Sequence, residues 1–205
     1  MQRFAPAPYA VAMAGHRQDR HESHALLRFS DVALVRGGRL LFENLSIAVH
    51  TGEALQVAGP NGSGKSSLLR LAAGLLRPSA GEVERCAVAL ADDSLALDGE
   101  LPLGKALAFW GGSVAPAMDA LGIAHLSGVP VRLLSSGQQK RASLARVASS
   151  LAPLWLLDEP LNALDAEGTE RLARLIQRHR DGGGAIVAAS HQSLLGEWRV
   201  LGIGQ

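Results

Sequence analysis

Residues 59–66 read Gly59-Pro60-Asn61-Gly62-Ser63-Gly64-Lys65-Ser66, and this stretch decides the fold. It matches the pattern G-x-x-x-x-G-K-S/T at every fixed position. The apolar stretch Ala54–Ala58 before it predicts a strand, and leucines at 68, 69, 71, 75 and 76 predict a helix over Ser66–Leu76. We therefore predict a phosphate-binding loop between a strand and a helix, rather than a turn that contains glycines by chance.

The residue types of this loop suit the chemistry of phosphate. Glycines let the backbone curl so that several N–H groups point inward, and the following helix adds the positive end of its dipole. We expect Lys65 to place a charge on the β- and γ-phosphates and the Ser66 hydroxyl to bind Mg²⁺. The stretch from Gly59 to Ser67 is thus the predicted nucleotide-binding segment.

The composition limits the classes of protein to consider. The chain has 205 residues, 47% of them hydrophobic, which is typical of one globular domain. Its net charge of +1 argues against a general nucleic-acid-binding surface. No apolar run reaches the roughly 18 residues that span a bilayer. The single cysteine, Cys86, excludes an internal disulfide, and its apolar surroundings predict that it is buried.

Beyond the loop, strand and helix patterns alternate. Leu27–Val35 and Leu45–Val49 are predicted to be antiparallel N-terminal strands, joined by a turn through Gly37-Gly38. Further strands are expected at Val83–Ala91, Leu154–Leu157, Ala185–Ser190 and Trp198–Ile203, and helices near Leu103–Trp110, Pro116–Ala124, Gln138–Ser150 and Glu167–Arg180. This order predicts an α/β fold with a mostly parallel core sheet and helices on both faces.

Residues 1–25 differ from the rest and show no helical or strand period. We predict a flexible leader there, followed by one domain over residues 26–205. A start site placed too early, with Met13 as the later start, is an alternative. The three histidines of this segment, His16, His21 and His24, lack other ligands and are not predicted to bind a metal.

A second candidate site lies at the end of the apolar stretch Leu154–Leu157, which is followed by Asp158 and Glu159. In a parallel sheet, an acid at this strand end lies beside the phosphate loop. Asp158 is placed to hold a Mg²⁺-bound water, and Glu159 to orient or deprotonate an attacking water. Without the phosphate loop, two solvated acids before Pro160 would be an adequate explanation.

A third candidate site is Ser135-Ser136-Gly137-Gln138, where Ser135 is the predicted N-cap of a helix. A capped helix start with a glycine and free N–H groups can bind an anion. The same residues could also serve only as a cap.

In this order, the three segments resemble those of the ATP-binding subunits of ABC transporters, from Leu26 to the C-terminus. The phosphate loop is similar to their Walker A motif, Leu134–Gln138 to their signature motif, and Leu154–Asp158 to Walker B. Asn162–Asp165 resembles their D-loop, and His191 lies where their switch histidine falls. The resemblance implies a P-loop NTPase fold with a small helical subdomain at about residues 92–150.

The resemblance also implies a mechanism. Lys65, Glu159 and His191 are the implied catalytic residues, with Ser66 and Asp158 at Mg²⁺. Two subunits would pack head to tail, so that the segment Ser135–Gln138 closes over ATP held by the other chain. It implies a homodimer that works with integral membrane subunits and binds no nucleic acid.

Two positions depart from the family pattern. The aromatic residue that stacks on adenine is replaced near Arg36, whose guanidinium could stack on a base or lie in a solvated turn. The glutamine expected after the strand Val83–Ala91 is missing, and Asp92, Asp93 or Ser94 is a candidate substitute.

The short length of the chain and the residues in and around its motifs resemble one group in particular. This group is the ATP-binding subunit of the haem exporter complex of bacterial cytochrome c maturation. This implies an ATPase located peripherally at the cytoplasmic face of the bacterial inner membrane. The alternatives are an ATPase subunit of another small-molecule or peptide exporter, and a nucleotide-binding regulatory module with little turnover.

Overall fold

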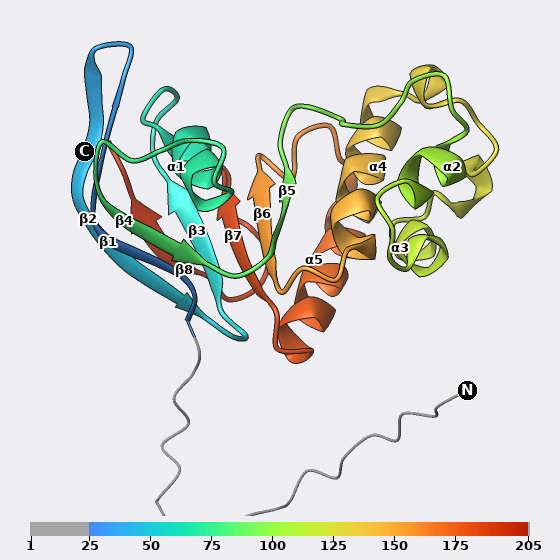
Figure 1. Ribbon diagram of the computed structural model, residues 1–205. Coiled ribbons are helices and arrows are strands. Elements are labelled where there is room, and N and C mark those ends of the chain that lie inside the picture. Colours follow the sequence, from blue (N-terminus) through green and yellow to red (C-terminus); the bar gives the residue numbers. More distant parts are fainter. Residues whose placement is uncertain (1–24, 205) are drawn as a thin grey trace, which may run out of the picture.

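The computed structural model describes residues 25–204, which form two sheets and the helices packed on them (Figure 1). The smaller sheet has the strand order β2-β1-β4 and the larger one the order β5-β6-β7-β3-β8. The α/β fold with a parallel core sheet and antiparallel N-terminal strands agrees with the prediction.

The antiparallel sheet is built around a hairpin. Strand β1 (Ala25–Arg36) pairs with β2 (Arg39–His50) on one side and with β4 (Ala80–Arg85) on the other. Leu27, Phe29 and Val32 of β1 are buried, so one face of the sheet packs on the core.

The larger sheet is entirely parallel. Its strands are β5 (Val88–Ala91), β6 (Leu154–Asp158), β7 (Ala185–Ala189), β3 (Ala54–Ala58) and β8 (Arg199–Gly202). Residues of β6 and β7 are almost all apolar and buried, as expected for strands covered on both faces. Because all five strands run the same way, the loops after β3, β5, β6 and β7 meet at one edge of the sheet.

Alternate residues of β6 point to opposite faces of the larger sheet, and each face packs on a different half of the core. Leu154 and Leu156 face helix α1 (Lys65–Ala72) and the antiparallel sheet. Trp155 and Leu157 face the other side, toward α4 (Ser136–Ser149) and α5 (Ala166–Asp181). The hydrophobic positions of the sequence thus place the phosphate-loop helix on one face and the helix after Ser135 on the opposite face.

The segment between β5 and α4 has short helices joined by loops. It contains α2 (Leu103–Ala108), α3 (Val114–Ala120) and two 3₁₀ turns, Ala124–Leu126 and Val131–Leu133. Helices α2 and α3 pack beside α4, at the far side of the molecule from the antiparallel sheet (Figure 1).

Two elements differ from the prediction. The expected single strand Val83–Ala91 is divided between β4 and β5, which belong to different sheets. The chain crosses from one sheet to the other at Cys86-Ala87, so Cys86 is only partly buried. The expected helix Ser66–Leu76 ends at Ala72, because Gly74 adopts a left-handed conformation with φ of 75°.

The predicted leader and its three histidines fall on residues 1–24, which lie outside the described residues; Ala25 is the first residue of β1. Among the helices of residues 25–204, none combines the length and the apolar character needed to cross a membrane.

Candidate functional site

The phosphate loop connects β3 to α1 as the sequence predicts. Its conformation needs glycine at two positions. A Cβ on Gly59 would lie 2.3 Å from the backbone oxygen of Ile203, and Ile203 is held in place because its N–H donates to the Ala58 oxygen at 2.9 Å. Gly64, with φ of 103°, is the N-cap of α1 and makes no side-chain cap hydrogen bond. The start of α1 therefore presents N–H groups that an anion can bind.

A cavity of about 350 Å³ opens on this loop. It is lined by Leu41, Asn61, Gly62, Gly64, Lys65, Ser66, Ser67 and Glu159. Lys65 is buried and its Nζ donates to the backbone oxygens of Gly59 (2.8 Å) and Pro60 (3.1 Å). The ammonium is thus held over the loop by two weak neutral acceptors, which a phosphate can replace.

The residues expected at Mg²⁺ lie together at this edge. Asp158 ends β6, is 4% exposed and has one buried carboxylate oxygen, Oδ1, without a hydrogen-bond partner. Burial raises the pKa of Asp158 above its ordinary value, whereas a hydrogen bond from Ser66 lowers it. An unsatisfied buried carboxylate oxygen beside a hydroxyl fits a hard divalent cation.

This pair is not a complete metal site by itself. Within residues 25–204, no group of three His, Cys, Asp or Glu side chains could hold a metal ion. Mg²⁺ is usually bound through one or two carboxylates together with substrate phosphates. The residues present therefore fit Mg²⁺ that arrives with a nucleotide.

Glu159 and His191 are brought into contact, although 32 residues separate them. They follow the neighbouring strands β6 and β7, and the Glu159 N–H donates to the Ala189 oxygen at 2.9 Å. His191 Nδ1 lies 2.8 Å from Glu159 Oε2. The carboxylate that lines the phosphate cavity is therefore oriented by the histidine.

Glu159 also has an unusual backbone, with φ of 42° just before Pro160. The left-handed region costs a non-glycine residue on the order of 1–3 kcal/mol. Such a conformation persists only where the surrounding structure holds it, and it is common at functional sites.

Lys140 of α4 is a site residue that the sequence analysis did not single out. Its Nζ donates to the backbone oxygen of Asp158 at 2.9 Å. Burial lowers the pKa of Lys140, and the negative charges of Asp93, Asp158, Glu159 and Asp92 oppose this effect. No local sequence signal could identify this contact, because it joins two elements through the tertiary structure.

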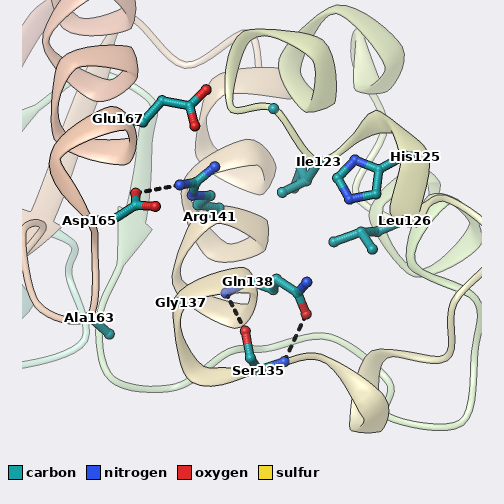
Figure 2. Close-up of a pocket in the computed structure, with 11 residues that line it drawn as sticks. Ile123, His125, Leu126, Ser135, Gly137, Gln138, Arg141, Ala163, Asp165 and Glu167 are labelled. Atoms are coloured by element: carbon teal, nitrogen blue, oxygen red, sulfur yellow. Dashed lines mark hydrogen bonds and ion pairs between the residues drawn. The ribbon is translucent and has the colours of Figure 1, made fainter.

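Ser135, Gly137 and Gln138 line a different cavity, which has a volume of about 390 Å³ (Figure 2). Ser136 lines a smaller cavity together with Asp93 and Lys140. Ser135 is the N-cap of α4 and accepts a hydrogen bond from the Gln138 N–H, while the Gln138 side chain accepts one from the Ser135 N–H. This capping box agrees with the predicted cap. The cavity shares no lining residue with the phosphate cavity.

Arg141, which is on the same helix as Gln138, and Asp165 also line this second cavity (Figure 2). Asp165 caps α5 by accepting from the Gly168 N–H at 2.8 Å, and it pairs with the Arg141 guanidinium. The Gly168 N–H and then Arg141 hold the pKa of Asp165 below its ordinary value. The expected D-loop is therefore fixed to the helix that carries Ser136, Gly137 and Gln138.

Arg36 and the acids after β5 are the two departures from the family pattern. The Arg36 guanidinium donates to the Ser67 hydroxyl at 3.2 Å, so it lies beside the phosphate loop. Asp92 and Asp93 follow β5, next to the strand end that carries Asp158. Asp92 lies 3.8 Å from Arg70, and Asp93 acts on the charges of both Asp158 and Lys140.

Comparison with known proteins finds one family. The model of a family described as ABC transporter matches residues 42–162. The chain is 53% identical over 177 residues to the cytochrome c biogenesis ATP-binding export protein CcmA of Sphingopyxis alaskensis, covering 82% of this chain and 91% of that protein. It is 56% identical over 168 residues to the protein of the same name from Novosphingobium aromaticivorans, covering 80% and 88%.

Two solved structures have a similar fold at 21% sequence identity. The ATP-binding subunit of an ABC transporter aligns with a TM-score of 0.75, covering 81% of this chain and 79% of that one. A dimeric ATP-binding cassette in a post-hydrolysis state, bound to ADP and Pi, aligns with a TM-score of 0.70, covering 81% and 88%.

Proposed function

Since the chain belongs to the ABC transporter family, we propose that it is the ATP-hydrolysing subunit of the haem exporter or haem-delivery complex of cytochrome c biogenesis. One observation carries the hydrolytic part of this proposal. The phosphate loop, the unsatisfied Asp158 carboxylate and the Glu159–His191 pair meet at one edge of the parallel sheet.

In the proposed reaction, the phosphate loop and the start of α1 bind the phosphates of ATP. Lys65 exchanges its two carbonyl acceptors for phosphate oxygens. Ser66 and Asp158 would hold Mg²⁺, which supplies positive charge to the phosphate oxygens when it is bound. We include all residues from Gly59 to Ser67 in the nucleotide site.

Glu159 acts on the attacking water. Its carboxylate faces the phosphate cavity, orients the water toward the γ-phosphorus and accepts the water proton. The bond from the γ-phosphorus to the bridging oxygen breaks, and ADP and phosphate are formed. His191 holds the Glu159 carboxylate and responds to the loss of the γ-phosphate.

The Ser135–Gln138 cavity contributes to a second chain. Helices α1 and α4 lie on opposite faces of the larger sheet, so the start of α4 is not placed to close over the nucleotide of its own subunit. We therefore assign Ser135, Ser136, Gly137 and Gln138 to the nucleotide of the partner in a head-to-tail homodimer. ATP binding would close this dimer and hydrolysis would open it.

Glu159→Gln tests this assignment, because the amide keeps the size of the side chain and cannot accept the water proton. The variant is expected to retain ATP binding, to lose hydrolysis and to accumulate as an ATP-bound dimer in size-exclusion chromatography. If the wild type has no more turnover than Glu159→Gln with its membrane partners present, the chain is a nucleotide-binding regulatory module.

The haem pathway is supported by the names of the relatives, which describe export proteins of cytochrome c biogenesis. Peripheral location at the cytoplasmic face of the inner membrane follows from this role. Deletion of the gene is expected to abolish cytochrome c maturation in the native bacterium, and the wild-type chain to restore it. Normal cytochrome c in the deletion strain would instead indicate an exporter of another small molecule or a peptide.

The partner in the membrane needs a docking surface, and we assign it to an apolar groove beside β5 with a volume of about 420 Å³. Leu75 and Trp110 line the groove and are 63% and 47% exposed. Phe109, next to it, is 83% exposed and packs edge-on against Trp110. Exposed aromatic and aliphatic side chains in one place are typical of interaction surfaces.

The groove also contains two opposite charges, those of Arg146 and Asp92, which interact with each other. Arg146 stacks under the Trp110 ring at 4.7 Å and donates to the Leu90 oxygen. The groove thus fits a short helix of the membrane subunit that presents apolar side chains. Phe109→Ser is expected to reduce co-purification of the membrane subunits, whereas Leu195→Ser, which changes an exposed leucine outside the groove, is not.

A further inference from the structure

The peptide unit between Asp158 and Glu159 is fixed at both of its polar ends. Its N–H, on Glu159, donates to the Ala189 oxygen of β7 at 2.9 Å. Its carbonyl oxygen, on Asp158, accepts from the Lys140 ammonium of α4 at 2.9 Å. Strand β7 and helix α4 therefore both restrict the rotation of this peptide.

This rotation decides where the Glu159 carboxylate points. Glu159 has φ of 42° and is followed by Pro160, which further restricts its backbone. A non-glycine residue leaves this conformation unless its neighbours hold it. The Lys140 hydrogen bond is one of the two contacts of this peptide that oppose such a change.

The positive charge of Lys140 also stabilises this arrangement. Asp92, Asp93, Asp158 and Glu159 each attract the ammonium electrostatically, although Asp92 also lies beside Arg70. The positive charge of Lys140 offsets the repulsion between these carboxylates. Lys140 is thus both a hydrogen-bond donor and a counter-ion at the end of β6.

We propose that Lys140 is a positioning residue that holds the Asp158–Glu159 peptide in the geometry needed for hydrolysis. The inference rests on the proposed role of Glu159. Lys140 belongs to α4, whose first residues we assign to the nucleotide of the partner chain. It therefore ties the helix start that acts on one ATP to the carboxylate that acts on the other.

Lys140→Met tests the proposal, since methionine keeps most of the side-chain volume and removes the donor and the charge. In the full chain purified from its native membranes, kcat is expected to fall about tenfold, as for other displaced catalytic groups. KM for ATP and the affinity for a fluorescent ATP analogue are expected to stay within about twofold. Lys140→Arg, which keeps a charged donor, is expected to recover most of kcat.

Lys105→Met is the matched control, because it removes the charge of an exposed lysine in α2 and is expected to leave kcat unchanged. The double variant Lys140→Met/Glu159→Gln is expected to be no slower than Glu159→Gln alone, because Lys140 acts through Glu159. If Lys140→Met does not fold by circular dichroism, Lys140→Gln takes its place.

The outcomes separate the inference from the proposed function. Normal hydrolysis by Glu159→Gln contradicts the role of Glu159 itself. Loss of hydrolysis in Glu159→Gln together with a wild-type kcat in Lys140→Met contradicts only the inference. A fall in ATP affinity equal to the fall in kcat would make Lys140 a binding residue and would also overturn it.

Discussion

The two helix starts that we assign to nucleotide, those of α1 and α4, differ in how their N–H groups are satisfied. Helix α1 begins after Gly64 and has no side-chain cap. Helix α4 begins with a complete capping box, in which Ser135 and Gln138 satisfy each other (Figure 2). The first start needs an anion from outside, whereas the second is stable without one.

This difference accounts for the separate roles that we propose for the two cavities. An uncapped start next to a lysine can bind the phosphates of a free nucleotide in a single chain. A start that is already capped offers its remaining N–H groups and the Ser135 hydroxyl proton, which suits a weaker contact made only when two chains meet. The four predictions below test this comparison, from the largest expected effect to the smallest.

Removal of the lysine should abolish the function of the first cavity. Lys65→Ala is expected to weaken binding of ATP by about 100-fold, because charge-assisted hydrogen bonds to desolvated phosphates are strong. Isothermal titration with Mg²⁺-ATP measures the affinity, and Lys105→Ala serves as the control for loss of a charge. An affinity of the wild-type value in Lys65→Ala would contradict the assignment of this cavity.

Substitution of Asp158, the proposed Mg²⁺ ligand, is expected to lower the affinity for ATP and to raise the stability of the nucleotide-free chain. Asp158→Asn is expected to lower the Mg²⁺-dependent affinity for ATP by at least about tenfold, because second-shell changes alone cost this much at metal sites. Burial raises the pKa of Asp158, so its charged form destabilises the nucleotide-free fold near neutral pH. The melting temperature of the nucleotide-free variant should therefore rise, and an unchanged dependence on Mg²⁺ would argue against this ligand.

The second helix start should respond in two separable ways. Ser135→Ala is expected to lower the stability of the chain by about 1 kcal/mol through loss of the cap, and to prevent dimerisation with ATP in the Glu159→Gln background. Ser135→Asp keeps a capping acceptor and removes the hydroxyl proton, so stability should return while dimerisation does not. Chemical denaturation and size-exclusion chromatography measure the two effects, and dimers of Ser135→Asp would contradict a contact with the partner's phosphate.

The smallest effect is expected from His179, which lies near the start of β6 and lines neither cavity. Its ring stacks on Trp155 at 3.8 Å, and burial lowers its pKa below the ordinary value of 6.5. Below pH 6.5 the unfolded chain therefore takes up a proton that the folded chain resists, and stability falls until the folded pKa is reached. His179→Phe keeps the stack and should show a weaker dependence of the melting temperature between pH 7.5 and 5.5; an identical dependence would exclude His179 as its source.

Sequence patterns predicted local features well and the junctions between elements poorly. The parallel sheet, the strand–loop–helix order around Gly59–Ser66 and the Ser135 cap are confirmed by the structure. The single strand over Val83–Ala91 is wrong, because the apolar stretch Cys86–Ala91 contains no turn residue at the point where the chain changes sheets. The last turn predicted for the helix after the loop is absent because Gly74 ends it.

The sequence alone determined the chemistry that lies within a few consecutive residues. A loop from Gly59 to Ser66 or a cap from Ser135 to Gln138 forms from neighbours in the chain, so its pattern can be recognised in the sequence. The tertiary structure decided which distant groups meet. His191 reaches Glu159, and Lys140 reaches the Asp158 carbonyl, only because parallel strands end at one edge and α4 packs against that edge.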